Sequence, residues 1–445
     1  MSWFKILIVT IVIVCGSGIS MFDCAAAQSI AELRMRIAKL EALLLGVTRD
    51  GDDITFEAVN VRIVSGSGDT NGEVNGLGNL IVGYDEPRQS GSDKTGSHNI
   101  VVGPHHNYSL FGGLVVGNAN AIVGGYATVT GGMNNEAIGY ASTVSGGSNN
   151  TAGNLYSSVG GGRYNIASGL NAFVGGGGGE DSVDGNEAYA DYSAILGGRH
   201  NITGYPESND HSVGTHSTVS GGSSNTASGL NASVSGGIGN ESTGYGSSVS
   251  GGHSNTAGLV DEGFEYIVAP SVSGGYENKA SWHFSSVSGG RKNTASSDSA
   301  SVSGGFENTA SGFEASVSGG RFNVASGQSA FVGGGGGSRE RDGNVAFAHY
   351  SSILGGWRNI AGDPNLDDRD IGLQSVVSAG SSNVASGNRS AVSGGYNNTA
   401  SAAGASVSGG RYNNASALGA SVSGGNRTSV DNRYDWAAGD LYEAD

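Results

Sequence analysis

The 445-residue chain has very little cysteine, proline or positive charge. Both of its cysteines, Cys15 and Cys24, lie in the first 27 residues, so the remainder has no thiol for a disulfide or a cysteine metal site. Proline occurs only five times, and 22 Lys plus Arg stand against 39 Asp plus Glu, a formal net charge of −17. This acidic balance argues against a nucleic-acid partner, because nucleic acids are bound through basic surfaces.

Glycine, in contrast, is abundant, with 81 residues, but it does not occupy every third position, which excludes collagen. Richness in glycine and serine without a period would suggest a flexible linker. Here an apolar residue recurs every 15 positions, with steps of 21, 23 or 24 at insertions. These apolar residues, called the anchors below, are Val129, Val144, Val159, Val174, Ile195, Val219, Val234, Val249, Val272, Val287, Val302, Val317, Val332, Ile353, Val377, Val392, Val407 and Val422.

A short fixed period means that each unit buries its apolar face by stacking on its neighbours. Around the anchor Val317 the residues alternate, so Ala315 and Gly319 should point inward with it, and Ser316 and Ser318 outward. We therefore predict an all-β fold, a parallel β-solenoid or β-roll with coils of about 15 residues. Each coil should consist of a strand, a glycine turn, a second strand and a second turn.

Two positions of the repeat hardly vary. The third residue after the anchor is always glycine, as at Gly320, which fits a turn with positive φ or a close approach between coils. The sixth is asparagine in 15 of 18 units, for example Asn308 and Asn323. Amides stacked one coil apart predict a hydrogen-bonded ladder that satisfies the turns. The alternative is a polar row offered to a ligand.

The N-terminal sequence predicts export. Lys5 precedes an apolar run over residues 6–14, and Ala25–Ala27 offers a cleavage site. We interpret residues 1–27 as a secretory signal peptide, with a permanent membrane anchor as the alternative, and expect a secreted or cell-surface protein.

The rest of the chain divides into four further segments. Residues 28–48 predict a short coiled-coil helix, 49–100 a β-rich lead-in, 101–430 the repeat domain and 431–445 a C-terminal cap. The helix has a heptad seam, which favours oligomerisation over packing on the next domain. The residues of this seam are Ile30, Leu33, Ile37, Leu40, Leu44 and Val47.

A longer period overlies the first. The block 159–234 reappears 158 residues later as 317–392, with its 21- and 24-residue steps in the same order. We interpret the two copies as a block that was duplicated whole, and its insertions as integral loops.

The Ser-Val-Ser-Gly-Gly and Asn-Thr-Ala-Ser-Gly units resemble the head repeats of trimeric autotransporter adhesins over roughly residues 79–430. The resemblance implies a left-handed parallel β-roll, three chains side by side, and attachment to host or matrix surfaces. Independently, each coil offers about one Val and two Ala to its core, a thin core that calls for burial between chains. We predict a homotrimer with Ala and Val surfaces and the heptad seam at the interface.

Motifs for catalysis are lacking: the chain has no G-x-S-x-G, P-loop, H-E-x-x-H or C-x-x-C sequence. Residues 176–184 fit a calcium-binding nonapeptide, but the duplicate has Arg339 where Asp181 stands. Four aspartates of one segment could gather a hard cation, although a solvated acidic loop is favoured; they are Asp363, Asp367, Asp368 and Asp370. We therefore predict no enzyme, no cofactor, no metal and no catalytic residue.

The function favoured by these patterns is an adhesin-like structural rod that attaches to a surface or matrix. An ice-binding β-solenoid and a polysaccharide-acting β-helix protein are the alternatives. Uniform coils distinguish partners poorly, so recognition is expected in the inserted segments, where aromatic residues and histidines gather. Packing of the loops on the roll is the other interpretation of these residues. The candidate partner-binding residues are Tyr189, Tyr192, Tyr205, His211, His216, Phe347, His349, Tyr350 and Trp357.

Overall fold

The computed structural model describes residues 21–259, 268–439 and 441–443, and most of the expected signal peptide lies outside them. The chain divides into two compact units, residues 1–63 and 64–445. The first contains the helix α2 (Met21–Leu43) and an antiparallel hairpin of β1 (Val47–Asp50) and β2 (Asp53–Phe56). Among the described residues, no helix is long and apolar enough to cross a membrane.

The helix ends earlier than the heptad seam predicts. Leu44 lies in a turn and Val47 begins β1, because Asp50-Gly51 favours a hairpin whose loop places Gly51 at φ 56°. The other seam residues remain exposed in the single chain: Ile30 50 %, Leu33 54 %, Ile37 51 % and Leu40 57 %.

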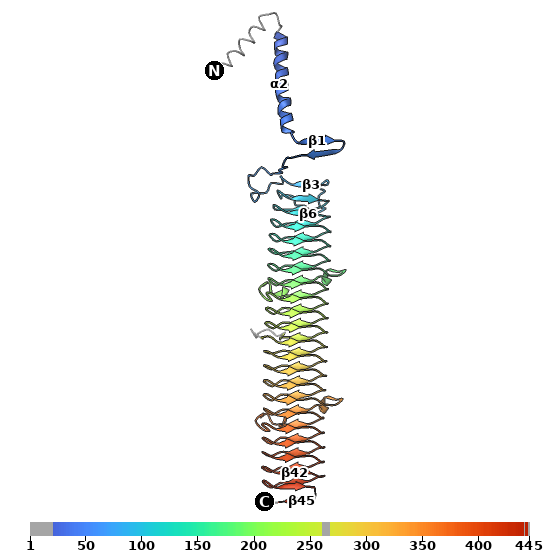
Figure 1. The fold of residues 1–445 in the computed structure, drawn as a ribbon, viewed down its shortest axis with the longest axis vertical. Coiled ribbons are helices and arrows are strands. Elements are labelled where there is room, and N and C mark those ends of the chain that lie inside the picture. The colour runs from blue at the N-terminus through green and yellow to red at the C-terminus, as the bar shows by residue number, and fades with distance from the viewer. Residues whose placement is uncertain (1–20, 260–267, 440, 444–445) are drawn as a thin grey trace. The chain divides into compact units, whose positions relative to one another are not determined.

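The second unit is a parallel β-solenoid of about 22 turns (Figure 1). One sheet, the anchor sheet, contains the strands that carry the anchors. Its strands are β3 (Leu80–Val82), β4 (Ile100–Val102), β6 (Leu114–Val116), β8 (Thr128–Val129), β10 (Thr143–Val144), β12 (Ser158–Val159), β14 (Phe173–Val174), β16 (Ala194–Ile195), β18 (Thr218–Val219), β20 (Ser233–Val234), β22 (Ser248–Val249), β24 (Ser271–Val272), β26 (Ser286–Val287), β28 (Ser301–Val302), β30 (Ser316–Val317), β32 (Phe331–Val332), β34 (Ser352–Ile353), β36 (Val376–Val377), β38 (Ala391–Val392), β40 (Ser406–Val407), β42 (Ser421–Gly424) and β44 (Trp436–Ala438).

The second sheet, the alanine sheet, contains the other strand of each coil. Its strands are β5 (Asn107–Tyr108), β7 (Ala121–Ile122), β9 (Glu136–Ala137), β11 (Thr151–Ala152), β13 (Ile166–Ala167), β15 (Glu187–Ala188), β17 (Ile202–Thr203), β19 (Thr226–Ala227), β21 (Glu241–Ser242), β23 (Thr256–Ala257), β25 (Lys279–Ala280), β27 (Thr294–Ala295), β29 (Thr309–Ala310), β31 (Val324–Ala325), β33 (Val345–Ala346), β35 (Ile360–Ala361), β37 (Val384–Ala385), β39 (Thr399–Ala400), β41 (Asn414–Ala415) and β43 (Ser429–Val430).

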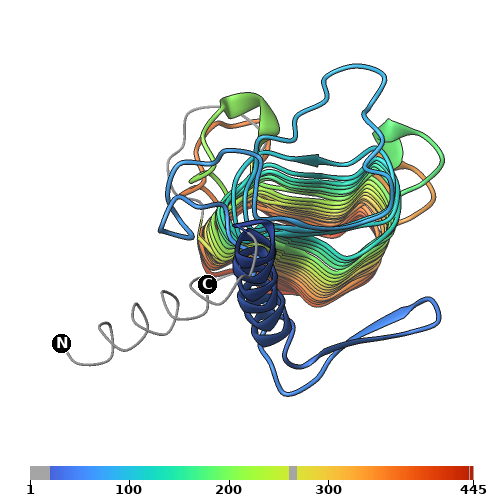
Figure 2. The ribbon, with the colours of Figure 1, turned by 90° about the horizontal axis from the view of Figure 1, so that it is seen from above.

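The coils stack in register, as the 15-residue period predicts. In the pair β28–β30, Ser301 lies beside Ser316 and Val302 beside Val317, and the view along the stack shows the coils superimposed (Figure 2). The predicted fold class is therefore confirmed. At the C-terminal end, β45 (Leu441–Glu443) pairs antiparallel with β44 and departs from the parallel order.

The core of each coil is a valine or isoleucine packed with alanines. Ala315 is 0 % and Val317 1 % exposed, whereas Ser318 is exposed, so the predicted directions of these residues are confirmed. The inward direction predicted for Gly319 is wrong: a Cβ on it would have no heavy atom within 4 Å, because the strand ends before the turn. The Ala and Val residues of this core are not free to form an interface between chains, and an interface of other Ala and Val residues stays a prediction. The core side chains are already buried inside one chain, because the two sheets of a coil face each other across a single layer of small residues.

The asparagine ladder also exists, and it is buried rather than offered to a ligand. The backbone N–H of Asn308 donates to Oδ1 of Asn293 at 3.0 Å, and its Nδ2 donates to the carbonyl oxygens of Gly304 and Gly320, each at 2.9 Å. Asn308 is 0 % exposed. Such bonds run from Asn120 to Asn413, so the ladder satisfies backbone groups of the turns that follow the anchor strands.

Two residues of the ladder were not predicted from the sequence pattern. Asn186 and Asn344 occupy the ladder, bonded to Asn165 and Asn323. An inserted loop separates each of them from its anchor, so counting six residues forward from the anchor finds Glu180 or Ser338 instead.

The glycine three residues after each anchor is required by both conformation and space. Gly305 has φ 95°, and a Cβ on it would lie 2.2 Å from the carbonyl oxygen of Gly320 in the next coil. A side chain at this position would therefore push neighbouring coils apart.

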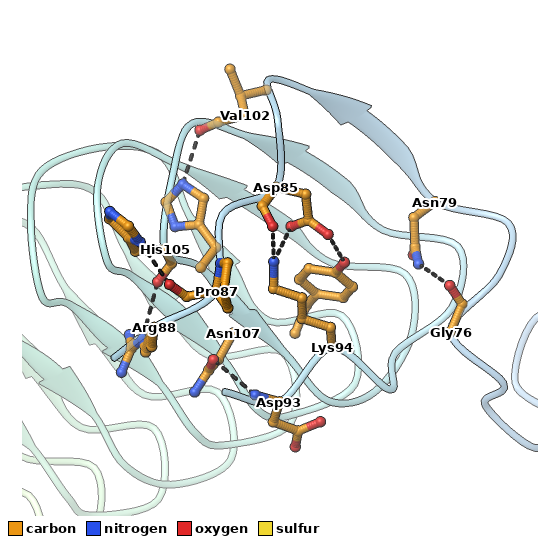
Figure 3. Close-up of polar contacts among 12 residues, drawn as sticks. Gly76, Asn79, Asp85, Pro87, Arg88, Asp93, Lys94, Val102, His105 and Asn107 are labelled. Atoms are coloured by element: carbon orange, nitrogen blue, oxygen red, sulfur yellow. Dashed lines mark hydrogen bonds and ion pairs between the residues drawn. The ribbon is translucent and has the colours of Figure 1, made fainter. Parts of the chain in front are cut away.

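The N-terminal end of the solenoid is covered by the segment between β3 and β4 (Figure 3). Asp85 pairs with Lys94 at 2.7 Å and accepts the hydroxyl of Tyr108 at 3.0 Å. Burial, together with this hydrogen bond, raises the pKa of Tyr108 well above its ordinary value. Beneath the segment, Nδ1 of the buried His106 accepts the N–H of Asn120 at 3.2 Å, so His106 caps the ladder.

Candidate functional site: the two edges of the solenoid

Each coil presents two turns, and the stacked turns form two edges. The first edge carries the residues four and five positions after the anchor, such as Arg291 and Lys292. The second edge carries the turn that leads to the next anchor strand, such as Phe313 and Glu314. Lys292 and Glu314 have φ values of 56° and 55°, so the second residue of each turn takes the left-handed conformation.

The insertions project from these edges. Loops 178–185 and 336–343 leave the first edge, and loops 204–216 and 362–374 leave the second, so each edge carries a loop at two levels of the stack (Figure 1). A further insertion, at 258–270, also belongs to the second edge, and its residues 260–267 lie outside the described part of the chain. The recurrence of both loop pairs after 158 residues agrees with a duplicated block.

The first-edge loops are fastened by ion pairs. In the first block, Asp184 of η1 (Ser182–Asp184) pairs with Arg199 at 3.1 Å. In the second, Asp342 of η3 (Glu340–Asp342) binds Arg358, with Nε 2.7 Å from Oδ1. Burial by itself would raise the pKa of Asp342, but the hydrogen bond and charge of Arg358 outweigh it and lower the pKa below its usual value. Arg358 is one position beyond the equivalent of Arg199, so the two blocks make the pair with different residues.

In the first block, part of the candidate partner-binding set holds the second-edge loop in place. Tyr189 is 7 % exposed, and its ring stacks on His211 at 4.2 Å between centroids. His211 Nδ1 also lies 2.7 Å from the carbonyl oxygen of Tyr189. Tyr192 stacks on His216 at 5.2 Å, but both remain exposed to solvent. Tyr205, beside η2 (Pro206–Ser208), is exposed and has no ring partner among the described residues.

In the second block the candidates divide in the same way. Phe347 is half-buried beneath Arg369, and His349 Nδ1 accepts the N–H of Gln328 at 2.8 Å. Tyr350 is exposed, like its counterpart Tyr192. Trp357 lies on the first edge instead, with Arg358 stacked 4.8 Å from its centroid. The structure thus assigns packing roles to Tyr189 and His211, and binding by the exposed members stays a prediction.

The sequence analysis missed a set of cations that the fold gathers. Eight of the 13 Lys and Arg residues between positions 101 and 430 occupy the first edge, with Glu277 and Glu307 as the acidic residues at the same two turn positions. A basic run along the chain would not reveal them, since all except the adjacent Arg291 and Lys292 are more than 15 residues apart. Aligning the coils column by column would have found them. The eight are Arg163, Arg199, Arg291, Lys292, Arg321, Arg358, Arg411 and Arg427.

The hollows of the surface are shallow. One of about 400 Å³ follows the second edge of the last coils and is lined by Leu373, Arg389, Leu418 and Tyr434 among others. Within the described ranges, no three His, Cys, Asp or Glu side chains lie together so that they could hold a metal ion. This search covers the nonapeptide at 176–184 and the aspartates at 363–370.

No protein-family model matches the chain, and no curated protein matches it closely enough to count as a relative. The parallel β-solenoid is thus established by the structure, whereas membership of the trimeric autotransporter adhesins has no support from a match.

Proposed function

We propose that the protein is a secreted or cell-surface, adhesin-like structural rod that attaches to a surface or matrix. The observation that carries the proposal is the duplicated placement of loops on two edges of a uniform scaffold. A rigid scaffold with variable loops is the usual arrangement for recognition, because the loops change without cost to the core. The exposed Tyr192 and its equivalent Tyr350 place an aromatic ring at two levels of the second edge.

We further propose that the rod assembles as a homotrimer through α2. The seam residues of the helix are about half exposed in one chain, and apolar area of this kind is removed from water when helices associate. The valines and alanines of the coil cores are buried within one chain, so the helix seam is the apolar surface on which this assembly rests.

Ice binding is not favoured by the faces of the solenoid. The register of the alanine sheet places Thr226, Glu241, Thr256, Lys279 and Thr294 in one row. A regular threonine row is therefore interrupted by charged side chains on alternate coils.

Attachment of protein-coated beads to basement-membrane gel, cellulose and glass tests the proposal. The variant Tyr192→Asn/Tyr205→Asn/Tyr350→Asn removes the exposed tyrosine of loop 204–216 and the two exposed tyrosines of the turns beside the second-edge loops. Asparagine tolerates the positive φ of Tyr192 and Tyr350. Attachment to the preferred surface should fall at least about tenfold, the loss of a hot-spot contact. The control Tyr156→Asn/Tyr245→Asn changes exposed tyrosines of the same edge outside these loops and should attach normally. Equal attachment by wild type and both variants would contradict the assignment to the loops.

A further inference from the structure

A row of alternating aromatic and basic side chains follows the first edge across five coils. Parallel backbone bridges place His253, Tyr276, Arg291, Phe306 and Arg321 one coil apart in register. The row is therefore a fixed array with the spacing of the sheet, not a chance cluster of long side chains.

Contacts between these side chains are continuous. The rings of His253 and Tyr276 stack at 5.1 Å, and the Arg291 guanidinium lies 5.4 Å from the centroids of both Tyr276 and Phe306. Arg321 lies 5.0 Å from Phe306 on the next coil. Each arginine is thus held against a ring, which limits its rotamers and leaves N–H donors for a ligand.

The arginines of the row make no close ion pair within the described residues, although the hydrogen bond of Tyr276, the charge of Lys292 and the charge of Arg291 lower the pKa of Glu277. Arg291 and Arg321 are exposed, and no ion pair joins either of them to a carboxylate in the described part of the chain. The neighbouring Lys292, in contrast, pairs with Glu277 at 3.5 Å. The two guanidinium groups are therefore the available cations of this stretch.

The same arrangement recurs lower on the first edge. Arg411 lies 5.6 Å from the Tyr396 ring, Arg427 lies 5.8 Å from the Tyr412 ring, and the two tyrosines meet edge to face at 5.3 Å. Elsewhere the coils are acidic, so this edge is the part of the solenoid suited to an anion.

The distance between the two arginines determines how the charges of a ligand must be spaced. Arg291 and Arg321 are two coils apart, roughly 9.6 Å at the usual distance between strands. A single carboxylate or phosphate cannot reach both, so the ligand must carry charges at intervals along its length. A sugar in an extended polysaccharide advances by roughly the distance between coils, so a charge on every second sugar would match the arginines.

Nucleic acid fits this array less well. A strand of duplex DNA carries a phosphate about every 3.4 Å along the axis, a far denser charge than the row of arginines. Glu277 and Glu307 stand beside the row, and the whole chain has a net charge of −17, so a dense polyanion would be repelled.

We propose that the first edge binds an acidic polysaccharide with one uronate carboxylate per disaccharide. This inference rests on the proposed adhesive function and names the class of its ligand. The carboxylates pair with Arg291 and Arg321, and the intervening neutral sugar lies along the coil that carries Phe306.

Binding to immobilised hyaluronan, an alternating uronate polymer, tests the inference, with dextran as neutral probe and single-stranded oligothymidine as nucleic-acid probe. Arg291→Gln/Arg321→Gln should weaken hyaluronan binding about tenfold or more, the loss expected for two charge-assisted contacts. The control Lys279→Gln/Arg389→Gln removes the same charge from the alanine-sheet face and the second edge, and it should bind as the wild type does. Thermal unfolding should be the same for all three proteins, since all four side chains are exposed.

Equal weakening in both double variants would show that net charge alone matters and would overturn the inference. So would tighter binding to oligothymidine, or no binding to hyaluronan. If bead attachment persists in those cases, the adhesive function stands and only the ligand class fails. If the wild type binds hyaluronan through the row but attaches to no surface, the adhesive function fails and this inference stands.

Discussion

The interior of the coils is uniform in sequence, whereas their edges vary from coil to coil. Inside, most coils repeat the same buried residues, an anchor, a facing alanine and a ladder asparagine, next to an invariant turn glycine. On the edges the equivalent positions hold tyrosine, arginine, glutamate, serine or glycine, and the insertions occur there. The interior is constrained because any change is transmitted to two neighbouring coils, whereas an edge residue faces solvent. Stability therefore resides in the uniform rows and recognition in the variable ones.

The largest contrast should come from two adjacent positions of one coil, the last residue of β28 and the residue that follows it. Val302→Asp places a carboxylate where the side chain is 1 % exposed and has no partner for the charge, so we expect a loss of about 4 kcal/mol or local opening of the coils. Ser303→Asp, on the outer face, should cost less than about 0.5 kcal/mol. Thermal unfolding followed by circular dichroism compares the two. Similar melting temperatures would mean that the inward and outward directions are misassigned.

A smaller but clear loss is expected in the ladder. Asn308→Ala leaves the N–H of Asn323 and the carbonyls of Gly304 and Gly320 without their amide partner, at a cost of about 3 kcal/mol. Asn426→Ala removes an exposed amide from the first edge and should change the stability little. Denaturant unfolding measures the free energy of unfolding of both variants. An equally small loss in the two would show that the ladder contributes little to stability.

The smallest contrast is expected between two consecutive glycines of the turn. Gly305→Ala adds a Cβ 2.2 Å from a carbonyl oxygen at φ 95°, so we expect it to lose about 2 kcal/mol. A Cβ on Gly304 would have no heavy atom within 4 Å, and Gly304→Ala should be neutral. Melting temperatures of the two variants decide the matter, and a neutral Gly305→Ala would show that the coils can separate without cost.

The sequence predicted the interior well because its signals are periodic. Alternation at Ala315, Ser316 and Val317 defines the two faces of a strand, and the recurring asparagine indicates a stacked amide. The exceptions are local: Asn186 joins the ladder after a loop, and Val47 leaves the heptad pattern for a hairpin.

The edges were harder to predict, because their contacts join residues from different coils. Tyr189 and His211 are 22 residues apart in the chain yet stacked, so exposure could not be judged from composition. The arginine row became visible only once Arg291 and Arg321 were placed on one edge.

The most direct test of the account is the mass of the purified protein in solution, measured by light scattering together with circular dichroism. We expect the mass of three chains for the wild type, and of one chain for Leu33→Asp/Leu40→Asp, which puts charges on the exposed seam of α2. The single-chain variant should keep its β signal, because the core of each coil is complete within one chain. A folded wild-type monomer would contradict the proposed trimer. A seam variant that unfolds would contradict the claim that the core of a single chain is sufficient for folding.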